Sequence, residues 1–282
     1  MNFANSVRSE NRQPYSLLAT RGGLDVRLAM SAQEIAACQK LRYKVFHEEL
    51  KAKPDTVALA VGMDLDGFDE ICDHLLVSDG GEVVGTYRLL RQDVAEARHG
   101  FYTQGEFDIA PLLEAHCEFR FIELGRSCVL KPWRTKPVVE LLWQGIWNYV
   151  RLNSFDVMFG CASLEGTDTG ALSQALSYLH HNHLADQNWR ARAHQEQFVE
   201  MNIIPASEID MRAAFKSLPP LIKGYLRLGA RVGSGAVVDY QFNTTDVFII
   251  LPVAHINPRY FEYFGAPDEM AGKGKPQVLK CI

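Results

Sequence analysis

The sequence lacks any apolar run that approaches the roughly 18 residues needed to span a bilayer as a helix. The segment from Met1 to Thr20 also lacks the continuous apolar core of a secretory signal peptide. We therefore expect a cytoplasmic protein, whose contact with a membrane would be peripheral and made at the cytoplasmic face of the inner membrane.

Paired cysteines and an excess of positive charge are also missing. The six cysteines contain no C-x-x-C pair and follow no regular spacing, which indicates reduced thiols rather than a disulfide framework. The formal net charge of −5 argues against a general nucleic-acid binder, which needs a basic surface. Hydrophobic residues make up 47% and charged residues 22%, as in ordinary soluble globular proteins.

The sequence does contain a succession of helix and strand patterns. Ser31 followed by Glu34 forms a capping box at a helix start, and Asp79-Gly80-Gly81 is a hairpin turn between strands at 74–79 and 82–91. Further strands are expected at 118–130, 155–164, 236–242 and 246–253, and further helices at 138–153 and 218–232. This order predicts the α/β class, with a mixed sheet flanked by helices.

One domain is expected at residues 23–257. Residues 1–22 are predicted to be a loose N-terminal tail and residues 258–282 a C-terminal tail. Residues 165–218 are interpreted as a mostly helical insertion before the last helix and strands, with its clearest helical pieces at 170–181 and 187–201.

The strand "FIELGRSCV" carries an acid and an arginine, Glu123 and Arg126, three residues apart. In a regular strand they would point to opposite faces. A bulge at Gly125 would bring both to one face, where a carboxylate could accept a proton and an arginine could hold it or a substrate carboxylate. An ordinary ion pair at a sheet edge is the alternative, and the spacing alone leaves both open.

Two further groups of charges admit two interpretations each. Arg42 lies on the apolar stripe of the first helix, where it is either functional or a side chain that extends its charge to solvent. The acids of "DLDGFDEICD" fit a calcium-binding loop poorly, and a solvated loop or a site for a cationic amine is favoured.

A basic segment, with Lys131, Arg134 and Lys136, precedes the helix at Val138. Together with the free N–H groups of that helix start, it could hold a phosphate or an acidic partner, although basic surface loops are common.

The ordered stretches resemble a known superfamily. "LRYKVFHEE", "DLDGFDEICDHLLV", "GTYRLLR", "FIELGRSCV" and "LPPLIKGYLRLGARVGSGAVVDYQFNTTDVFIIL" are similar to N-acyltransferases of the GNAT fold, in the branch shared with autoinducer (acyl-homoserine-lactone) synthases. Within that branch the chain looks most like the bacterial L-ornithine Nα-acyltransferases that make lyso-ornithine lipid. The resemblance covers most of residues 35–252 and implies a GNAT-like, mostly antiparallel sheet.

The resemblance also implies roles for individual residues. Glu123 and Arg126 match the family's Glu-x-x-Arg, and "GYLRLGA" places Tyr225 where GNAT enzymes keep the tyrosine that protonates the departing thiolate. Substrate contacts are implied for five residues that match the synthases, Arg42, Phe46, Asp66, Asp69 and Arg88. They are also implied for Ser127, Cys128 and Val129 of the central strand.

A departure from the GNAT pattern indicates the donor. Enzymes of this fold that use coenzyme A carry Q/R-x-x-G-x-G/A at the central helix start, and "SCVLKPWRTKP" has no such loop. The implied donor is an acyl carrier protein (ACP) thioester, with Lys131, Arg134 and Lys136 binding the acidic carrier. The implied reaction is transfer of a 3-hydroxy fatty acyl group to the α-amine of L-ornithine, without a metal or a bound cofactor.

Other functions are possible on the same residues. The protein could be an N-acyl amino acid synthase with another acceptor, such as tyrosine. An autoinducer synthase is less favoured, because this chain is longer and carries the insertion. From a different class, it could be a non-catalytic module that binds ACP or lays the 218–232 helix on a bilayer.

Overall fold

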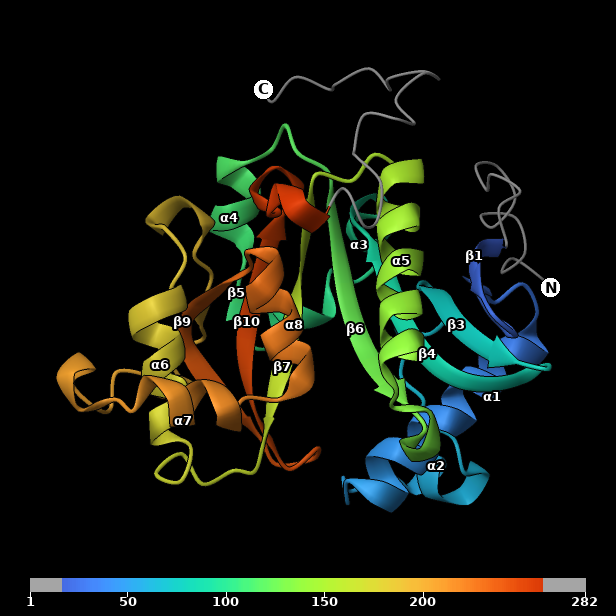
Figure 1. Ribbon diagram of the computed structural model, residues 1–282, viewed down its shortest axis with the longest axis horizontal. Coiled ribbons are helices and arrows are strands. Elements are labelled where there is room, and N and C mark those ends of the chain that lie inside the picture. Colours follow the sequence, from blue (N-terminus) through green and yellow to red (C-terminus); the bar gives the residue numbers. More distant parts are fainter. Residues whose placement is uncertain (1–16, 261–282) are drawn as a thin grey trace.

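The computed structural model describes residues 17–260 and contains a large mixed sheet with helices on both faces (Figure 1). The strand order is β1-β2-β3-β4-β6-β7-β10-β9-β8-β5, with every neighbouring pair antiparallel except β6–β7 and β8–β9. The strands are β1 (Leu17–Arg21), β2 (Leu24–Leu28), β3 (Asp73–Asp79), β4 (Glu82–Arg91), β5 (Phe107–Asp108), β6 (Phe121–Val129), β7 (Val157–Glu165), β8 (Arg192–Ala193), β9 (Arg231–Asp239) and β10 (Thr244–Pro252).

Helices α5 and α8 lie in front of β6 and β7 in Figure 1, and α1 packs on β4 from the other side. The helices are α1 (Ala32–Tyr43), α2 (Thr56–Val61), α3 (Gln92–Glu96), α4 (Ala110–Ala115), α5 (Lys136–Leu152), α6 (Ser173–His183), α7 (Met211–Ser217) and α8 (Pro220–Leu228). Helix α1 continues as a π-helix at Lys44–Glu49. Among the described residues, no helix is both long and apolar enough to cross a bilayer.

Local signals placed several of these elements as expected. The Ser31 hydroxyl accepts from the Glu34 N–H (3.2 Å) and the Glu34 carboxylate from the Ser31 N–H (3.2 Å), so the capping box starts α1. Gly80 and Gly81 both have positive φ, 55° and 94°, in the turn between β3 and β4. The α/β class and the mixed sheet are therefore confirmed.

Two expectations about the chain ends and the insertion need correction. Residues 17–21, predicted to belong to a loose N-terminal tail, form strand β1 instead. This strand pairs with β2 through a turn at Gly22 and packs on α5. Helix α6 confirms the helical piece at 170–181, but 187–201 forms a 3₁₀ turn at Gln187–Trp189 and the short strand β8 instead. There the Trp189 ring stacks on His116 (3.6 Å between centroids), β8 pairs with β5 and β9, and Val199 forms a bridge with Ala236, so tertiary contacts take the place of the local helical pattern. Residues 1–16 and 261–282 of the predicted tails lie outside the described residues.

Strands β6 and β7 pair only at their beginnings. The parallel register runs from Phe121↔Val157 to Glu123↔Phe159. At Gly160 a Cβ would lie 2.2 Å from the Leu124 carbonyl oxygen, so only glycine lets the backbones of β6 and β7 come this close before they separate. Beyond this point the strands diverge, and β6 keeps partners on the β4 side alone.

Candidate active site

A cavity of about 340 Å³ lies where β6 and β7 diverge. It is lined from the α1 side by Phe46, Arg88, Tyr102 and Glu123, and from the α8 side by Tyr87, Pro219 and Leu221. Residues of β6, β7 and β10 form its walls. A space that reaches both faces of a sheet between two strands can hold an extended ligand threaded between them.

A β-bulge shapes the β6 wall of this cavity. The register with β4 passes from Arg88↔Gly125 to Thr86↔Cys128, so Arg126 and Ser127 together lie opposite Tyr87. Arg126 takes the left-handed conformation, with φ 50°. The bulge expected from the sequence is therefore present, one residue beyond Gly125, and Glu123 and Arg126 both line the cavity.

Glu123 is buried and hydrogen-bonded, but not by Arg126. Its carboxylate accepts from the N–H of Tyr102 (2.9 Å), the N–H of Thr103 (2.6 Å) and the Thr103 hydroxyl. Burial raises the pKa of Glu123, against the opposing effect of these donors. A carboxylate with a raised pKa at a cavity wall can take a proton from an amine.

Arg126 belongs instead to a cluster of three arginines and three aspartates. Arg42 binds Asp64 (2.7 Å) and Asp69 (2.7 Å). Arg88 binds Asp66 and Asp69, and Arg126 binds Asp66 (3.2 Å). Burial alone would raise the pKa of Asp69, but the charges of Arg42 and Arg88 lower it to about 2. Asp64, Asp66 and Asp69 of the acidic loop are therefore paired with arginines and not open to a cationic ligand.

The cluster orients Arg126 toward the cavity. Its guanidinium lies over the rings of Tyr102 (4.8 Å) and Phe242 (4.5 Å), which restrict its movement. The buried Nε lies 3.6 Å from a carboxylate oxygen of Asp64, which is beyond hydrogen-bond distance. Nε therefore faces the aspartates of the cluster, while the side chain of Arg126 lines the cavity.

The predicted substrate contacts divide into two groups. Phe46, Arg88 and Ser127 line the cavity together with Glu123 and Arg126. The remaining predicted contacts lie outside its lining, and two of them, Arg42 and Asp69, are only 1% and 5% exposed. The members of this second group are Arg42, Asp66, Asp69, Cys128 and Val129.

The backbone N–H groups near the end of β6 are only partly available to a ligand. The Leu130 N–H donates to the Val84 carbonyl (2.9 Å), so it is used by the sheet. Since N–H groups alternate in direction along a strand, that of Val129 points away from β4, toward the gap. The Val129 carbonyl on that side accepts from Arg134 Nε (3.0 Å).

Tyr225 is close to the cavity without lining it. Its hydroxyl lies 2.6 Å from the hydroxyl of Tyr87, which does line the cavity. Burial raises the pKa of Tyr87 to about 12 and that of Tyr225 well above its usual value, so both hydroxyls keep their protons at neutral pH. Tyr87 was not singled out from the sequence, where nothing but its position before Arg88 in "GTYRLLR" distinguishes it.

The basic segment before α5 is exposed. Arg134 forms an ion pair with Glu49 of the π-helix, and Lys136 lies 3.5 Å from Glu140. The Lys131 side chain is also exposed, on a 3₁₀ turn at Lys131–Trp133. Lys131 and Lys136 thus remain accessible to a partner, although Lys136 lies beside Glu140, whereas Arg134 is held by two hydrogen bonds to Glu49.

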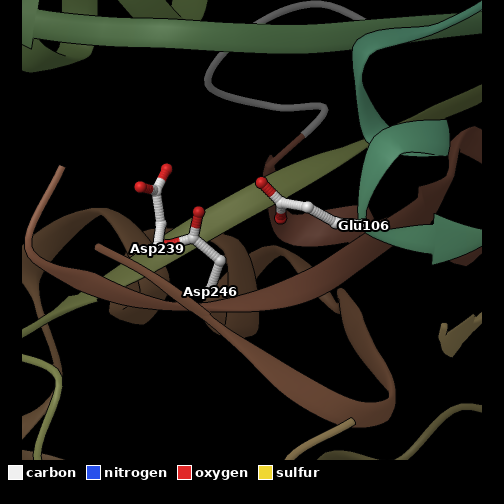
Figure 2. Close-up of side chains that lie close together, drawn as sticks. All are labelled: Glu106, Asp239 and Asp246. Carbon is white, nitrogen blue, oxygen red and sulfur yellow. The ribbon is translucent and has the colours of Figure 1, made fainter. Parts of the chain in front are cut away.

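A second group of acids, also missed from the sequence, lies on the face of the sheet that carries Glu123 (Figure 2). Carboxylate oxygens of Glu106, Asp239 and Asp246 lie within 4.8 Å of one another, close enough to hold a cation. The three are far apart in sequence and match no motif, so no local signal could have found them.

Comparison with known proteins identifies the relatives of this chain. Residues 41–144 match the acetyltransferase (GNAT) domain. The L-ornithine N(alpha)-acyltransferase of Agrobacterium fabrum is 50% identical over 276 residues, covering 95% of this chain and 94% of that protein. The Rhizobium meliloti protein of the same name is 50% identical, covering 89% and 87%.

The chain belongs to the L-ornithine N(alpha)-acyltransferase family. It is therefore an N-acyltransferase with a GNAT-like fold, as the resemblance implied, and the non-catalytic module is not retained. Helix α8 agrees with this conclusion, since Ile222, Tyr225 and Leu226 of its apolar face are buried in the core rather than free for a bilayer. Among solved structures, the N-acyl amino acid synthase FeeM from uncultured soil microbes aligns at TM-score 0.47 and 11% identity, covering 82% of this chain and 91% of that one.

Proposed function

We propose that this N-acyltransferase moves a 3-hydroxy fatty acyl group from an ACP thioester to the α-amine of L-ornithine, the first step of ornithine lipid synthesis. The names of its relatives support the acceptor. The observation that carries the mechanism is the buried carboxylate of Glu123 at the wall of a cavity that opens between β6 and β7.

The choice of ACP as donor rests on the start of α5. A 3₁₀ turn at Lys131–Trp133 and Pro137 in the first turn of α5 stand where a coenzyme A enzyme has its glycine-rich loop. The free edge of β6 beyond Glu123 supports a pantetheine arm in the gap beside β7. Exposed Lys131 and Lys136 suit the acidic surface of a carrier protein.

Glu123 would act as the base. The amine nitrogen attacks the thioester carbonyl as Glu123, directly or through one water, takes the proton that nitrogen releases. Arg126, which lines the cavity together with Glu123, would bind the ornithine carboxylate. The Arg42 and Asp69 pair would position Arg88 and Arg126 rather than touch substrate, because it is already paired and buried.

The tetrahedral intermediate would form beside the end of β6. The Val129 N–H, directed into the gap, would donate to the oxyanion, and loss of such a donor typically costs about 3–4 kcal/mol. When the C–S bond breaks, the thiolate takes a proton from Tyr87, which Tyr225 hydrogen-bonds from behind. Tyr225 would thus act through Tyr87.

The expected setting is the cytoplasm, where acyl carrier proteins deliver their acyl chains. The product carries one fatty acyl chain and would partition into the inner membrane, so a peripheral contact there is part of the proposal.

The Glu123→Gln variant tests the base. We expect transfer from 3-hydroxyacyl-ACP to ornithine to fall at least ~100-fold, since general base catalysis contributes that much. Products are identified by mass, with a thermal melt to check folding because the amide would place an N–H₂ against the N–H of Tyr102 or Thr103. Glu196→Gln, an exposed acid, is the control. Near-normal turnover of a folded Glu123→Gln protein would remove Glu123 from the mechanism.

An N-acyl amino acid synthase with another acceptor remains the second candidate. A panel of amino acids offered with 3-hydroxyacyl-ACP decides between them. Equal acylation of tyrosine and ornithine by the purified protein would favour the second candidate.

A further inference from the structure

The Glu106, Asp239 and Asp246 carboxylates share a sheet face with the proposed base. The register pairs Glu123 with Phe159, and Cys161 and Ser163 follow on the same face of β7. Ser163 lies opposite Asp246 on β10, and Thr244, two residues earlier, lies opposite Asp239 on β9. Asp239 and Asp246 line the same cavity as Glu123.

Glu106 reaches this face from the segment that holds Glu123. The 3₁₀ turn at Tyr102–Gly105 supplies two N–H donors to Glu123, and Glu106 follows immediately. In Figure 2 its carboxylate points toward those of Asp239 and Asp246. One short segment therefore sets the spacing between the proposed base and the three acids.

None of the three acids forms an ion pair in the described chain, although the charge of Arg126 acts on Glu106 and Asp246, and Asp239 Oδ1 accepts from the N–H groups of Gln241 (2.7 Å) and Phe242 (2.9 Å). Asp246 is 6% and Glu106 9% exposed, yet Asp246 Oδ1 and Glu106 Oε2 have no hydrogen-bond partner in the described chain. The Thr244 hydroxyl beside them is buried and likewise without a partner there. Within residues 17–260, no lysine, arginine or histidine forms an ion pair with any of the three, whereas Asp64, Asp66 and Asp69 all meet arginines.

Unpaired buried carboxylates are unfavourable unless something else supplies the charge. Burial and the neighbouring charge of Asp246 raise the pKa of Glu106 to about 8, and burial and Asp239 raise that of Asp246 to about 6. A cation bound among them would relieve both the repulsion and the missing hydrogen bonds. An ammonium has three donors, which matches three carboxylates.

We propose that Glu106, Asp239 and Asp246 bind the side-chain ammonium of the acceptor amino acid and so select ornithine over amino acids without a terminal amine. This proposal rests on the proposed function and specifies the acceptor half of the same cavity. The α-amine lies toward Glu123 and the α-carboxylate toward Arg126, while the side chain extends along the face of β7 and β10 to the acids. The three acids are specificity-determining residues and take no part in proton transfer at the α-amine.

The test compares ornithine with norvaline, which has the same length of chain but no terminal amine. For the wild-type protein we expect a strong preference for ornithine. In Asp246→Asn and Glu106→Gln, the KM for ornithine should rise about 10–100-fold, as expected for a lost charge-assisted hydrogen bond, with no fall in norvaline turnover. Glu165→Gln, an exposed acid on the cavity rim outside the group, is the matched control and should keep the preference.

A second measurement avoids the chemistry altogether. Ornithine without donor should raise the melting temperature of the wild-type protein more than norvaline does, and this difference should vanish in Asp246→Asn. Since the site sets a fixed distance, wild-type turnover should also fall for both 2,4-diaminobutyrate and lysine. This length series needs no variant and stands even if one fails to fold.

The outcomes separate the two proposals. If the wild-type protein acylates ornithine but Asp246→Asn and Glu106→Gln keep its preference over norvaline, the ammonium site is wrong and the acyltransferase function stands. If the wild-type protein does not acylate ornithine, both fail. If Ca²⁺ or Mg²⁺ stabilises the wild-type protein and Asp246→Asn abolishes that effect while acceptor preference is unchanged, the acids bind a metal ion instead.

Discussion

Glu123 and Glu106 are both buried carboxylates with a raised pKa, but they differ in the hydrogen-bond partners that surround them. Glu123 is held by two N–H groups and a hydroxyl, which partly offset its desolvation. Glu106 has an oxygen without a partner in the described chain and a second acid beside it. The first arrangement suits a base that remains in place, and the second a site that is completed by a cation.

The raised pKa of Glu106 predicts a pH-dependent stability. The folded protein holds this proton up to about pH 8, whereas the unfolded chain releases it near 4.5. The folded state therefore binds more protons between these values, and its free energy of unfolding falls as pH rises through that window. Glu106→Gln removes the ionisation, so we expect it to raise the melting temperature at pH 8 and to change it little at pH 4.5.

Thermal melts at the two pH values, without ornithine, measure this effect. Glu196→Gln, an exposed acid, should leave the melting temperature unchanged at both. A Glu106→Gln protein that melts at the wild-type temperature at pH 8 would show that Glu106 ionises without a penalty.

At the scale of elements, the arginine–aspartate cluster joins helix α1 to strands β4 and β6. Arg42 of α1 binds Asp64 and Asp69 of the loop after α2, and the same acids meet Arg88 of β4 and Arg126 of β6. The bulged residue of β6 is therefore held by charges from the α1 side of the sheet. The left-handed backbone of Arg126 is maintained by these contacts.

Removal of Arg42 should destabilise the protein strongly. Arg42→Met leaves Asp64 and Asp69 buried without their main counterion, and breaking a buried pair in this way costs about 3–5 kcal/mol. Arg27→Met, which removes the part-exposed pairs of Arg27 with Asp25 and Glu34, should cost only about 0–1 kcal/mol. Urea unfolding measures both, and equal losses would show that the cluster adds nothing beyond a surface ion pair.

At the scale of the whole molecule, a chain of net charge −5 carries two exposed lysines, Lys131 and Lys136, at the start of α5. An acidic carrier protein would be repelled by most of such a surface and attracted to this part of it. Attraction of this kind acts on encounter and weakens with salt.

Reversal of the charges of Lys131 and Lys136 should therefore weaken the use of acyl-ACP without affecting a small acyl thioester donor. In the Lys131→Glu, Lys136→Glu double variant, we expect the KM for acyl-ACP to rise about tenfold at low salt, whereas a small acyl-pantetheine thioester is used as before. Arg98→Glu, an exposed arginine after α3, is the control. Equal loss with both donors would indicate damage to the cavity rather than a lost docking surface.

The sequence by itself determined the parts that depend on near neighbours. The capping box at Ser31, the glycine turn between β3 and β4, the β6 strand and the bulge beside Gly125 all follow from residues a few positions apart. The pair Glu123 and Arg126 could be predicted for the same reason, because one bulge sets their relative direction.

Only the tertiary structure decided which groups meet across the sheet. The packing of helix α8, of the loop after α2 and of the segment after the Tyr102–Gly105 turn on the strands brought Tyr225 to Tyr87, Asp66 to Arg126, and Glu106 to Asp239 and Asp246. These contacts join residues far apart in the chain, and a shift of one residue in register would turn each strand side chain to the other face. The helical pattern at 187–201 also gave a wrong prediction, because Trp189 stacks with His116 and Phe119, which lie far from it in the sequence.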